Sequence, residues 1–431
     1  MTTPENAGSD YDVVISGASL AGSAAAILLA RRGARVALLE RRSDPAAYRV
    51  LCTHNVHASA YPVLDELGLL PAIERAGAVP NTARWYTRWG WIEPTDVLAG
   101  PGLPSGYNLR RSVLDPMIRA RAAQTPGVEL LLGHQVTGLV REAGRTVGVR
   151  ASTPQGEREL RGRLVVGADG RDSAVAKFAG VPARAYENAR FGYLAYYRDL
   201  PLPDDMTRAW FLEPDMAYAF PNDDGVTVVA VLPHKKRLPG FRADLEGSFD
   251  AFVRALPGAP DIDSAERISK IIGMLDYPLR EREPIAPGIA FIGDAALTGD
   301  PVWGSGCGWA LQSAKWLTEA VAPAVTGRGD LDPALAEYAR THRERMRRQK
   351  DRHISFATGR PLNPLERLMF AAAARDESMA RHMHRFQTRA IGPLRFLNPV
   401  ALARAAAVNL RSGGPAVPHV RPRRGAGAAS R

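Results

Sequence analysis

Residues 11–40 read YDVVISGASLAGSAAAILLARRGARVALLE, and this stretch decides the fold. Its two apolar runs, 13–15 and 35–39, have the character of strands that are buried on both faces. Between them, residues 24–30 are rich in Ala and Leu and favour a helix, which Gly33 ends. The stretch therefore predicts a strand–helix–strand unit at the start of a doubly wound, Rossmann-like α/β fold.

The turn Gly17-Ala18-Ser19-Leu20-Ala21-Gly22 lies between the first strand and the helix. A helix N-terminus presents free N–H groups to a pyrophosphate, and glycines permit the tight turn that brings the backbone close to it. Ser19 replaces the usual middle glycine but is small. Glu40 ends the second strand, where a carboxylate accepts hydrogen bonds from ribose hydroxyls and repels a 2′-phosphate. The turn and Glu40 predict a site for FAD or NAD rather than NADP.

Three further motifs follow strands or start helices. Gly167-Ala168-Asp169-Gly170 and Ile292-Gly293-Asp294-Ala295 each end a buried apolar run, and Arg111-Ser112-Val113-Leu114-Asp115 begins a helix. A loop of small residues, 300–308, precedes a long helix and can turn its backbone amides toward a planar ring or an anion. Each motif alone is typical of a turn or a cap, but their order and spacing together predict one nucleotide site.

With these motifs in this order, residues 10–330 resemble the para-hydroxybenzoate hydroxylase-like family of FAD-dependent monooxygenases. The set is shared with flavin-dependent halogenases and geranylgeranyl-type reductases. The resemblance implies FAD as cofactor, NADPH or NADH as reductant and molecular oxygen as co-substrate. It implies hydroxylation or epoxidation of an aromatic or polycyclic, polyketide-like small molecule through a flavin C4a-hydroperoxide, in secondary metabolism. The flavin then carries the chemistry, so no protein side chain is a certain catalytic residue.

The resemblance also assigns roles to individual residues. Gly17, Ser19 and Gly22 are expected at the pyrophosphate, Glu40 at the adenosine ribose and Asp294 at the ribityl chain. The complete implied cofactor-binding set is Gly17, Ser19, Leu20, Ala21, Gly22, Glu40, Arg41, Arg49, Arg111, Asp169, Asp294, Pro301, Gly304, Gly306, Cys307 and Gly308. Candidates for lining the flavin and substrate pocket are His54 and Pro301.

Two other flavin chemistries and one non-catalytic function remain open. Trp89-Gly90-Trp91-Ile92-Glu93-Pro94 is similar to the halogenase signature Trp-x-Trp-x-Ile-Pro, but it departs at Glu93 and precedes the Asp-Gly motif. No lysine occurs before Lys177, whereas halogenases need an earlier one. The alternatives to oxygenation are therefore reduction of isoprenoid double bonds, halogenation, and binding of FAD without catalysis.

Aromatic residues alternate with polar ones over 191–232, which predicts an antiparallel sheet with one wet face. In the resembled family such a sheet covers the substrate. The predicted organisation is an FAD-binding domain of residues 11–81, 106–185 and 281–330, an inserted substrate-binding domain of residues 82–105 and 186–280, C-terminal helices over 331–412, and disordered ends at 1–10 and 413–431.

The net charge of +11 belongs to the C-terminal part, where residues 341–431 hold 19 Lys and Arg against 5 Asp and Glu. This pattern is typical of a solvated face, and the alternatives are an acidic carrier protein, a membrane surface or a homodimer contact. No nucleic-acid motif accompanies the charge, so a nucleic-acid partner is not expected. No apolar stretch is long enough to span a membrane and the first ten residues lack a signal core, so a cytoplasmic location is expected.

Cysteine and histidine give no metal site. The chain has only Cys52 and Cys307, too few for a four-cysteine zinc site or a disulfide framework. His54 and His57 are three residues apart with no further ligand close by in sequence. We expect the cysteines to be packing residues, with a redox role beside the flavin as the alternative.

Overall fold

The computed structural model describes residues 10–93, 106–203, 206–387 and 391–411. Its first elements are the predicted unit: β1 (Tyr11–Ser16), α1 (Leu20–Ala30) and β2 (Val36–Glu40). Strands β1 and β2 are parallel, with Val13 opposite Val36. The doubly wound fold class is confirmed. The ends predicted as disordered lie outside the described residues, apart from Asp10.

The first sheet holds eight strands, and its main path runs in the order β20-β21-β11-β1-β2-β8. Strands β21, β11, β1, β2 and β8 are parallel, so their carboxyl ends meet at one edge. Ser16, Glu40 and Gly167 all end strands at this edge. The other strands of this sheet are β8 (Val128–Leu132), β9 (Gln135–Glu142), β10 (Arg145–Thr153), β11 (Gly156–Gly167), β20 (Ile285–Ala286) and β21 (Ile289–Phe291).

The second large sheet is antiparallel except where β5 pairs parallel with β14. Its main path runs β17-β13-β16-β15-β14-β5-β6, and β18 pairs with β13. The structure also has two small sheets, β3-β7-β4 and β12-β19. Along the sequence, their strands fall between segments that belong to the two large sheets. The bounds are β3 (Asn55–Val56), β4 (Val79–Asn81), β5 (Ala83–Thr87), β6 (Gly90–Ile92), β7 (Gly106–Asn108), β12 (Arg184–Tyr186), β13 (Gly192–Arg198), β14 (Thr207–Phe211), β15 (Met216–Pro221), β16 (Val226–Leu232), β17 (Glu266–Arg267), β18 (Ile272–Met274) and β19 (Leu279–Glu281).

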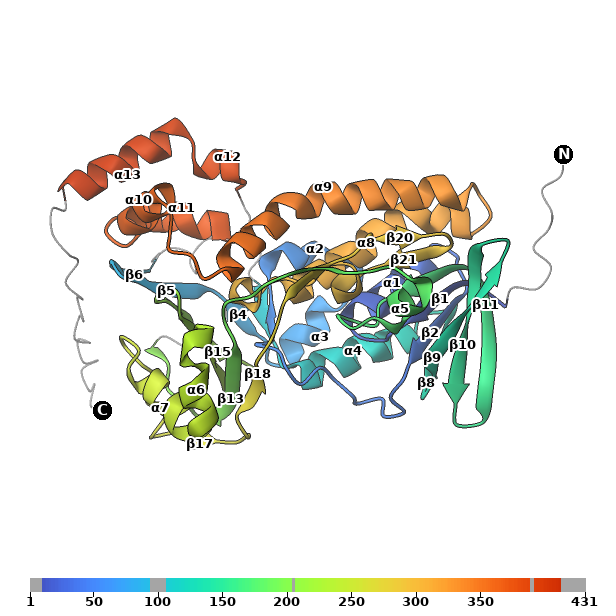
Figure 1. The fold of residues 1–431 in the computed structure, drawn as a ribbon, viewed down its shortest axis with the longest axis horizontal. Helices are drawn as coiled ribbons and strands as arrows, with labels where there is room; N and C mark the ends of the chain where they lie inside the picture. The colour runs from blue at the N-terminus through green and yellow to red at the C-terminus, as the bar shows by residue number, and fades with distance from the viewer. Residues whose placement is uncertain (1–9, 94–105, 204–205, 388–390, 412–431) are drawn as a thin grey trace, which may run out of the picture.

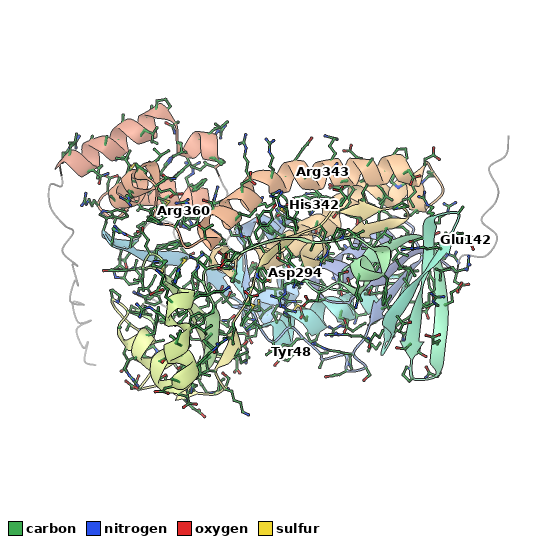
Figure 2. All side chains as sticks on the ribbon, in the orientation of Figure 1. Tyr48, Glu142, Asp294, His342, Arg343 and Arg360 are labelled. Carbon is green, nitrogen blue, oxygen red and sulfur yellow. The ribbon has the colours of Figure 1, made fainter. Side chains whose placement is uncertain are left out.

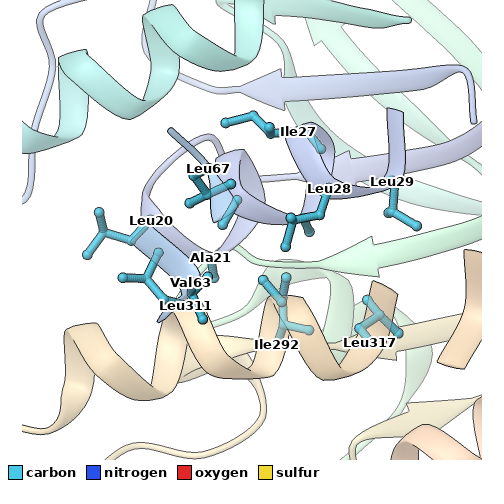
Figure 3. Close-up of a cluster of buried hydrophobic side chains, with 14 of the residues drawn as sticks. Leu20, Ala21, Ile27, Leu28, Leu29, Val63, Leu67, Ile292, Leu311 and Leu317 are labelled. Carbon is cyan, nitrogen blue, oxygen red and sulfur yellow. The ribbon is translucent and has the colours of Figure 1, made fainter. Parts of the chain in front are cut away.

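The main core lies between the first sheet and helices α1 and α8 (Gly306–Val325). Every residue of α1 is buried, which explains why its sequence is apolar all round. Figure 3 shows Leu20 and Leu28 of α1 facing Leu311 and Leu317 of α8. The other helices up to this point are α2 (Tyr61–Glu66), α3 (Leu70–Arg75), α4 (Arg111–Ala123), α5 (Ala174–Ala179), α6 (Leu238–Ala243) and α7 (Leu245–Arg254), with short 3-10 turns at Ala58–Ala60, Lys235–Arg237, Gly293–Ala295 and Pro301–Trp303.

The C-terminal helices cover the second sheet. Helix α9 (Leu331–Ala357) runs along one side of the molecule from the first sheet to the other C-terminal helices (Figure 1). Phe370, Met383 and Phe396 of these helices share a buried cluster with Phe211 and Tyr218 of the second sheet. The C-terminal helices therefore pack one side against the second sheet and expose residues on the other. The remaining helices are α10 (Pro364–Ala373), α11 (Glu377–Gln387), α12 (Pro393–Phe396) and α13 (Pro399–Arg411).

Within the described ranges, no helix is both long and apolar enough to cross a membrane.

A buried ion pair ties the second sheet region to the loop before α8. The Nη2 of Arg190 lies 2.8 Å from Oδ2 of Asp300, and the two side chains are 4% and 0% exposed. The same nitrogen donates to the carbonyl of Phe356, the penultimate residue of α9. The pair therefore joins three separate segments in an environment where an unpaired charge is costly.

We expect Arg190→Met to lower the free energy of unfolding by about 3 kcal/mol, because it leaves the Asp300 carboxylate buried without its partner. Urea unfolding measures this loss. The matched control is Arg198→Met, which removes an exposed ion pair with Asp224 and should cost less than about 1 kcal/mol. Equal losses in the two variants would contradict a structural role for the buried pair.

A second stability prediction concerns His342, which is buried in α9 against the rings of Trp316 and Tyr338. Burial lowers the pKa of His342 to about 4 from an ordinary 6.5, so the folded protein holds the ring neutral. The unfolded chain takes up a proton below pH 6.5. Stability should therefore fall as pH drops from 6.5 to 4, by on the order of 3 kcal/mol for this group.

The variant His342→Phe keeps an aromatic ring in place and removes the titration. Its unfolding free energy, measured across pH 4 to 7, should fall less steeply than that of the wild type. An unchanged slope would show that His342 is not neutral in the folded protein.

Candidate functional site

A cavity of about 490 Å³ opens at the carboxyl edge of the first sheet. It is bounded on one side by the ends of β1 and β2 and the segments that follow β11 and β21, and on the other by residues of β13 and β16. Ligands of open parallel sheets bind at this edge, where the chain crosses between neighbouring strands. Figure 2 labels Asp294 in this central region of the molecule. We refer to this space as the first cavity.

The N-terminus of α1 faces the first cavity through Ser19, Leu20 and Ala21. Ser19 is the N-cap residue and makes no side-chain cap hydrogen bond, so the first-turn N–H groups stay available to an anion. The turn needs its glycines. A Cβ on Gly17, whose φ is +105°, would lie 2.6 Å from the carbonyl oxygen of Ala168, and a Cβ on Gly22 would lie 1.8 Å from that of Gly17.

Asp294 carries a carboxylate that lines the first cavity and makes no hydrogen bond or ion pair within the described part of the chain. Burial raises its pKa, and the charges of Arg49, Arg111 and Arg171 oppose that rise. The site therefore combines a carboxylate able to accept hydroxyl protons with several guanidinium groups. Such a set suits a ligand that bears both hydroxyls and phosphates.

Arg111 connects the segments around the first cavity. Its guanidinium donates to Asp115 at 2.7 Å, to the Ser19 hydroxyl at 2.7 Å and to the Cys307 sulfur at 3.7 Å. The Asp115 carboxylate also accepts the backbone N–H of Arg49 at 3.0 Å. The cap of α1, the loop after β2, α4 and α8 therefore share one hydrogen-bonded network.

His54 packs against Arg111 and is not among the residues that line the first cavity, although its neighbours Thr53 and Asn55 are. Its place at the flavin and substrate pocket stays a prediction. His54 is 1% exposed, and both of its buried ring nitrogens have partners: Nδ1 accepts the backbone N–H of Arg111 at 3.0 Å, and Nε2 lies 2.7 Å from the Tyr196 hydroxyl. Its φ of +66° is a left-handed conformation that costs a non-glycine residue energy. The ring positions Arg111.

Cys52 and Cys307 both line the first cavity. Interaction with Cys307 lowers the pKa of Cys52, with His54 and Arg111 adding to the effect, whereas the same pairing and burial raise the pKa of Cys307. The two thiols are free in the structure. Among the described residues, no group of three or more His, Cys, Asp or Glu is placed to hold a metal ion.

A second cavity of about 510 Å³ shares Asn55, Gly304 and Ser305 with the first. One face of the second sheet forms its floor, with residues that alternate by two along three neighbouring strands. The floor residues are Ala83 and Trp85 of β5, Thr207 and Ala209 of β14, and Tyr218 and Phe220 of β15. The C-terminal helices form the opposite wall with Phe356, Phe370, Phe386 and Phe396.

Of the predicted cofactor set, all but Gly22 and Gly308 line the first cavity. Gly22 packs against the turn, and the nearest atoms to a Cβ on Gly308 belong to Ser59, His57 and Ala60. Asp169 lines the cavity and its carboxylate also caps α5, accepting the N–H of Val175 at 3.1 Å. The assigned cofactor roles of these residues stay predictions.

Two sets of residues escaped the sequence analysis. Arg119 holds the loop after β2 by donating to the carbonyl oxygens of Ala18 and Ala47. A helical arginine gives no signal for such a role. The walls contributed by α9 and the later helices were also missed, although Arg345, Arg348 and Arg352 have the spacing of one helix face.

Comparison with known proteins decides the family. Residues 10–353 match the family model described as FAD binding domain. The chain belongs to this family of FAD-dependent monooxygenases. It is 32% identical over 329 residues to 6-methylpretetramide 4-monooxygenase of Streptomyces rimosus, which covers 72% of this chain and 75% of that protein.

This FAD-dependent monooxygenase also has relatives with other names. It is 25% identical over 350 residues to digeranylgeranylglycerophospholipid reductase of Picrophilus torridus, covering 79% of this chain and 85% of the reductase. Among solved structures, a flavin-dependent brominase superposes with a TM-score of 0.74 at 19% identity, over 93% of this chain and 98% of the brominase. At that identity the likeness shows the fold alone.

The first cavity fits FAD on two observations. The backbone around Gly17 and Gly22 is so close that no side chain is tolerated, which leaves the N-terminus of α1 open to a pyrophosphate. The carboxylate of Asp294, which has no partner among the described residues, and the nearby arginines complement hydroxyl and phosphate groups. Gly17, Ser19, Glu40, Arg49 and Asp294 are the residues that would hold the cofactor.

We expect Gly17→Ala to purify with less than about a tenth of the wild-type FAD content, because its Cβ collides with backbone that cannot move aside. The absorbance of bound flavin per protein measures this. The matched control is Gly33→Ala, where φ is +93° but nothing lies within 4 Å of the new Cβ. That variant shares the backbone strain and should keep its FAD. Equal loss in both would attribute the effect to strain alone.

Proposed function

We propose that this monooxygenase is reduced by NADPH or NADH and transfers one oxygen atom from O₂ to an aromatic or polyketide-like small molecule, by hydroxylation or epoxidation. The observation that carries the proposal is the junction of the two cavities at Asn55, Gly304 and Ser305. A cofactor in the first cavity and a flat molecule in the second would meet there. Bound FAD supplies the electron transfer and oxygen activation by the route that the resemblance implies.

The chain itself binds, orients and excludes water. The aromatic walls of the second cavity suit a flat ring system, and they keep water from the junction. Gly304, with φ +56°, brings the loop before α8 so close to Asn55 that a Cβ would lie 2.3 Å from its side-chain nitrogen. The junction is thereby formed by close packing of the Gly304 backbone on the Asn55 side chain.

The relative from Streptomyces rimosus is named for oxygenation of a pretetramide. From this name we infer that the present chain also acts on a polyketide-like substrate. The inferred role is in secondary metabolism, in the cytoplasm. The predicted cofactor contacts of Gly17, Ser19, Glu40, Arg49, Arg111 and Asp294 belong to the same proposal.

The test is anaerobic mixing of the purified flavoprotein with NADPH and then NADH, followed by aerobic turnover with mono- to tetracyclic phenols and aromatic acids under isotopically heavy O₂. We expect bleaching of the oxidised-flavin band, accelerated by substrate, and a product that gains one heavy oxygen atom. The Gly17→Ala protein, with its expected loss of FAD, is the matched control.

Other products would overturn the proposal in distinct ways. A gain of hydrogen alone would indicate a double-bond reductase, as the Picrophilus torridus relative is named. A gain of halogen would indicate a halogenase. Flavin that neither coenzyme reduces, with or without aromatic compounds, would exclude a self-sufficient NAD(P)H-driven enzyme.

A further inference from the structure

Helix α9 turns one face toward the second cavity. Its lining residues Arg345, Arg348, Gln349, Arg352, His353 and Phe356 recur at the three- and four-residue spacing of a single helical stripe. Three of these six residues are arginines. A cavity with aromatic walls therefore carries a row of positive charge along one side.

Arg352 is the arginine set deepest in this row. Its guanidinium lies 4.5 Å from the ring centre of Phe386 and 5.8 Å from that of Trp303, while Arg345 and Arg348 are exposed. Within the described part of the chain, Arg352 makes no hydrogen bond and no ion pair with any protein group. Trp303 directly precedes Gly304, so this cation sits next to the junction with the first cavity.

The acidic side chain that lines the second cavity already binds other groups. Glu366 is the only acidic residue among those that line the second cavity in the described ranges. Its two oxygens bind Arg360 at 2.7 Å each, and one of them also accepts the backbone N–H of Asn363 in the cap of α10. Arg360 does not line the cavity, and Glu366 acts on Arg352 only as a nearby charge, with no hydrogen bond or ion pair between the two side chains in the described part of the chain.

A half-buried guanidinium without a partner is unfavourable, and its stacking on aromatic rings offsets only part of the cost. Burial also lowers the pKa of Arg352 from its ordinary value, although an arginine stays charged. A planar guanidinium presents a fork of donors that matches a carboxylate or an ionised 1,3-dicarbonyl.

We propose that the second cavity selects a planar aromatic substrate in its anionic form, with Arg352 binding the ionised group and thereby fixing which edge of the ring system reaches the junction. This rests on the proposed function for the identity of the cavity as the substrate site. Arg352 is a specificity-determining residue in this scheme, and Arg345 and Arg348 draw the anion toward the opening.

The experiment compares two isosteric fluorescent probes, anthracene-2-carboxylate and its neutral carboxamide, on the full FAD-loaded chain. Probe fluorescence gives the dissociation constants. The wild type should bind the carboxylate about tenfold more tightly than the carboxamide, the usual advantage of a charge-assisted hydrogen bond. Arg352→Gln should abolish most of this ratio while leaving carboxamide binding and FAD content unchanged, and Arg352→Lys should restore part of it.

Arg347→Gln is the matched control, since this exposed arginine lies on α9 outside the cavity lining and should keep the wild-type ratio. Equal weakening of both probes in Arg352→Gln would reduce Arg352 to a stacking wall and overturn the proposal. So would the absence of a carboxylate preference in the wild type.

Failure of the proposed function gives a different result. Probe binding does not depend on flavin reduction or turnover. The protein could bind the carboxylate through Arg352 while its flavin is never reduced by NADPH or NADH. That result would support the anion site and contradict the proposed monooxygenase mechanism.

Discussion

The buried guanidinium of Arg111 is the interaction on which the arrangement of the site depends. It joins the cap of α1, the carboxylate of Asp115 and the first turn of α8, and His54 holds its backbone from behind. Each of these groups is costly to bury alone and is satisfied only when all are present. The loop after β2, which has little regular structure, is fixed through this network because Asp115 binds the backbone of Arg49.

The second sheet has a double role. Residues on one face of β5, β14 and β15 line the second cavity, whereas Trp210 and Ala217, on the other face, pack with α6 and α7. The aromatic alternation of the sequence reflects this two-sided burial, and not the wet face that it suggested. The C-terminal helices cover the sheet and complete the cavity.

The part of the site around β1, α1 and β2 can be predicted from the sequence because its residues lie close together along the chain. Ser16 and Glu40 must share an edge once β1 and β2 are parallel neighbours, and the apolar runs fix that pairing. The rest depends on contacts that no spacing encodes. The His54 ring contacts the Tyr196 hydroxyl, which lies 142 positions away in the sequence. Arg352 contacts Trp303 because α9 runs along one side of the molecule from the first sheet to the second cavity. A row of arginines on a helix also has the same sequence pattern whether it faces solvent or a cavity.

The parallel pairing of β5 with β14 has a consequence for how this protein can change through evolution. Strand β5 belongs to the chain before α4, yet its register with β14 places Ala83 beside Thr207 in the sheet that floors the second cavity. A recombination event that exchanged one contiguous block around residues 192–232 would bring in a new β14 and keep the old β5. Strands β5 and β14, now from different parents, would then have to form matching backbone hydrogen bonds in the sheet that floors the second cavity. The β5–β14 pairing therefore constrains exchange of segments at the second cavity more than it constrains point substitution of the lining residues.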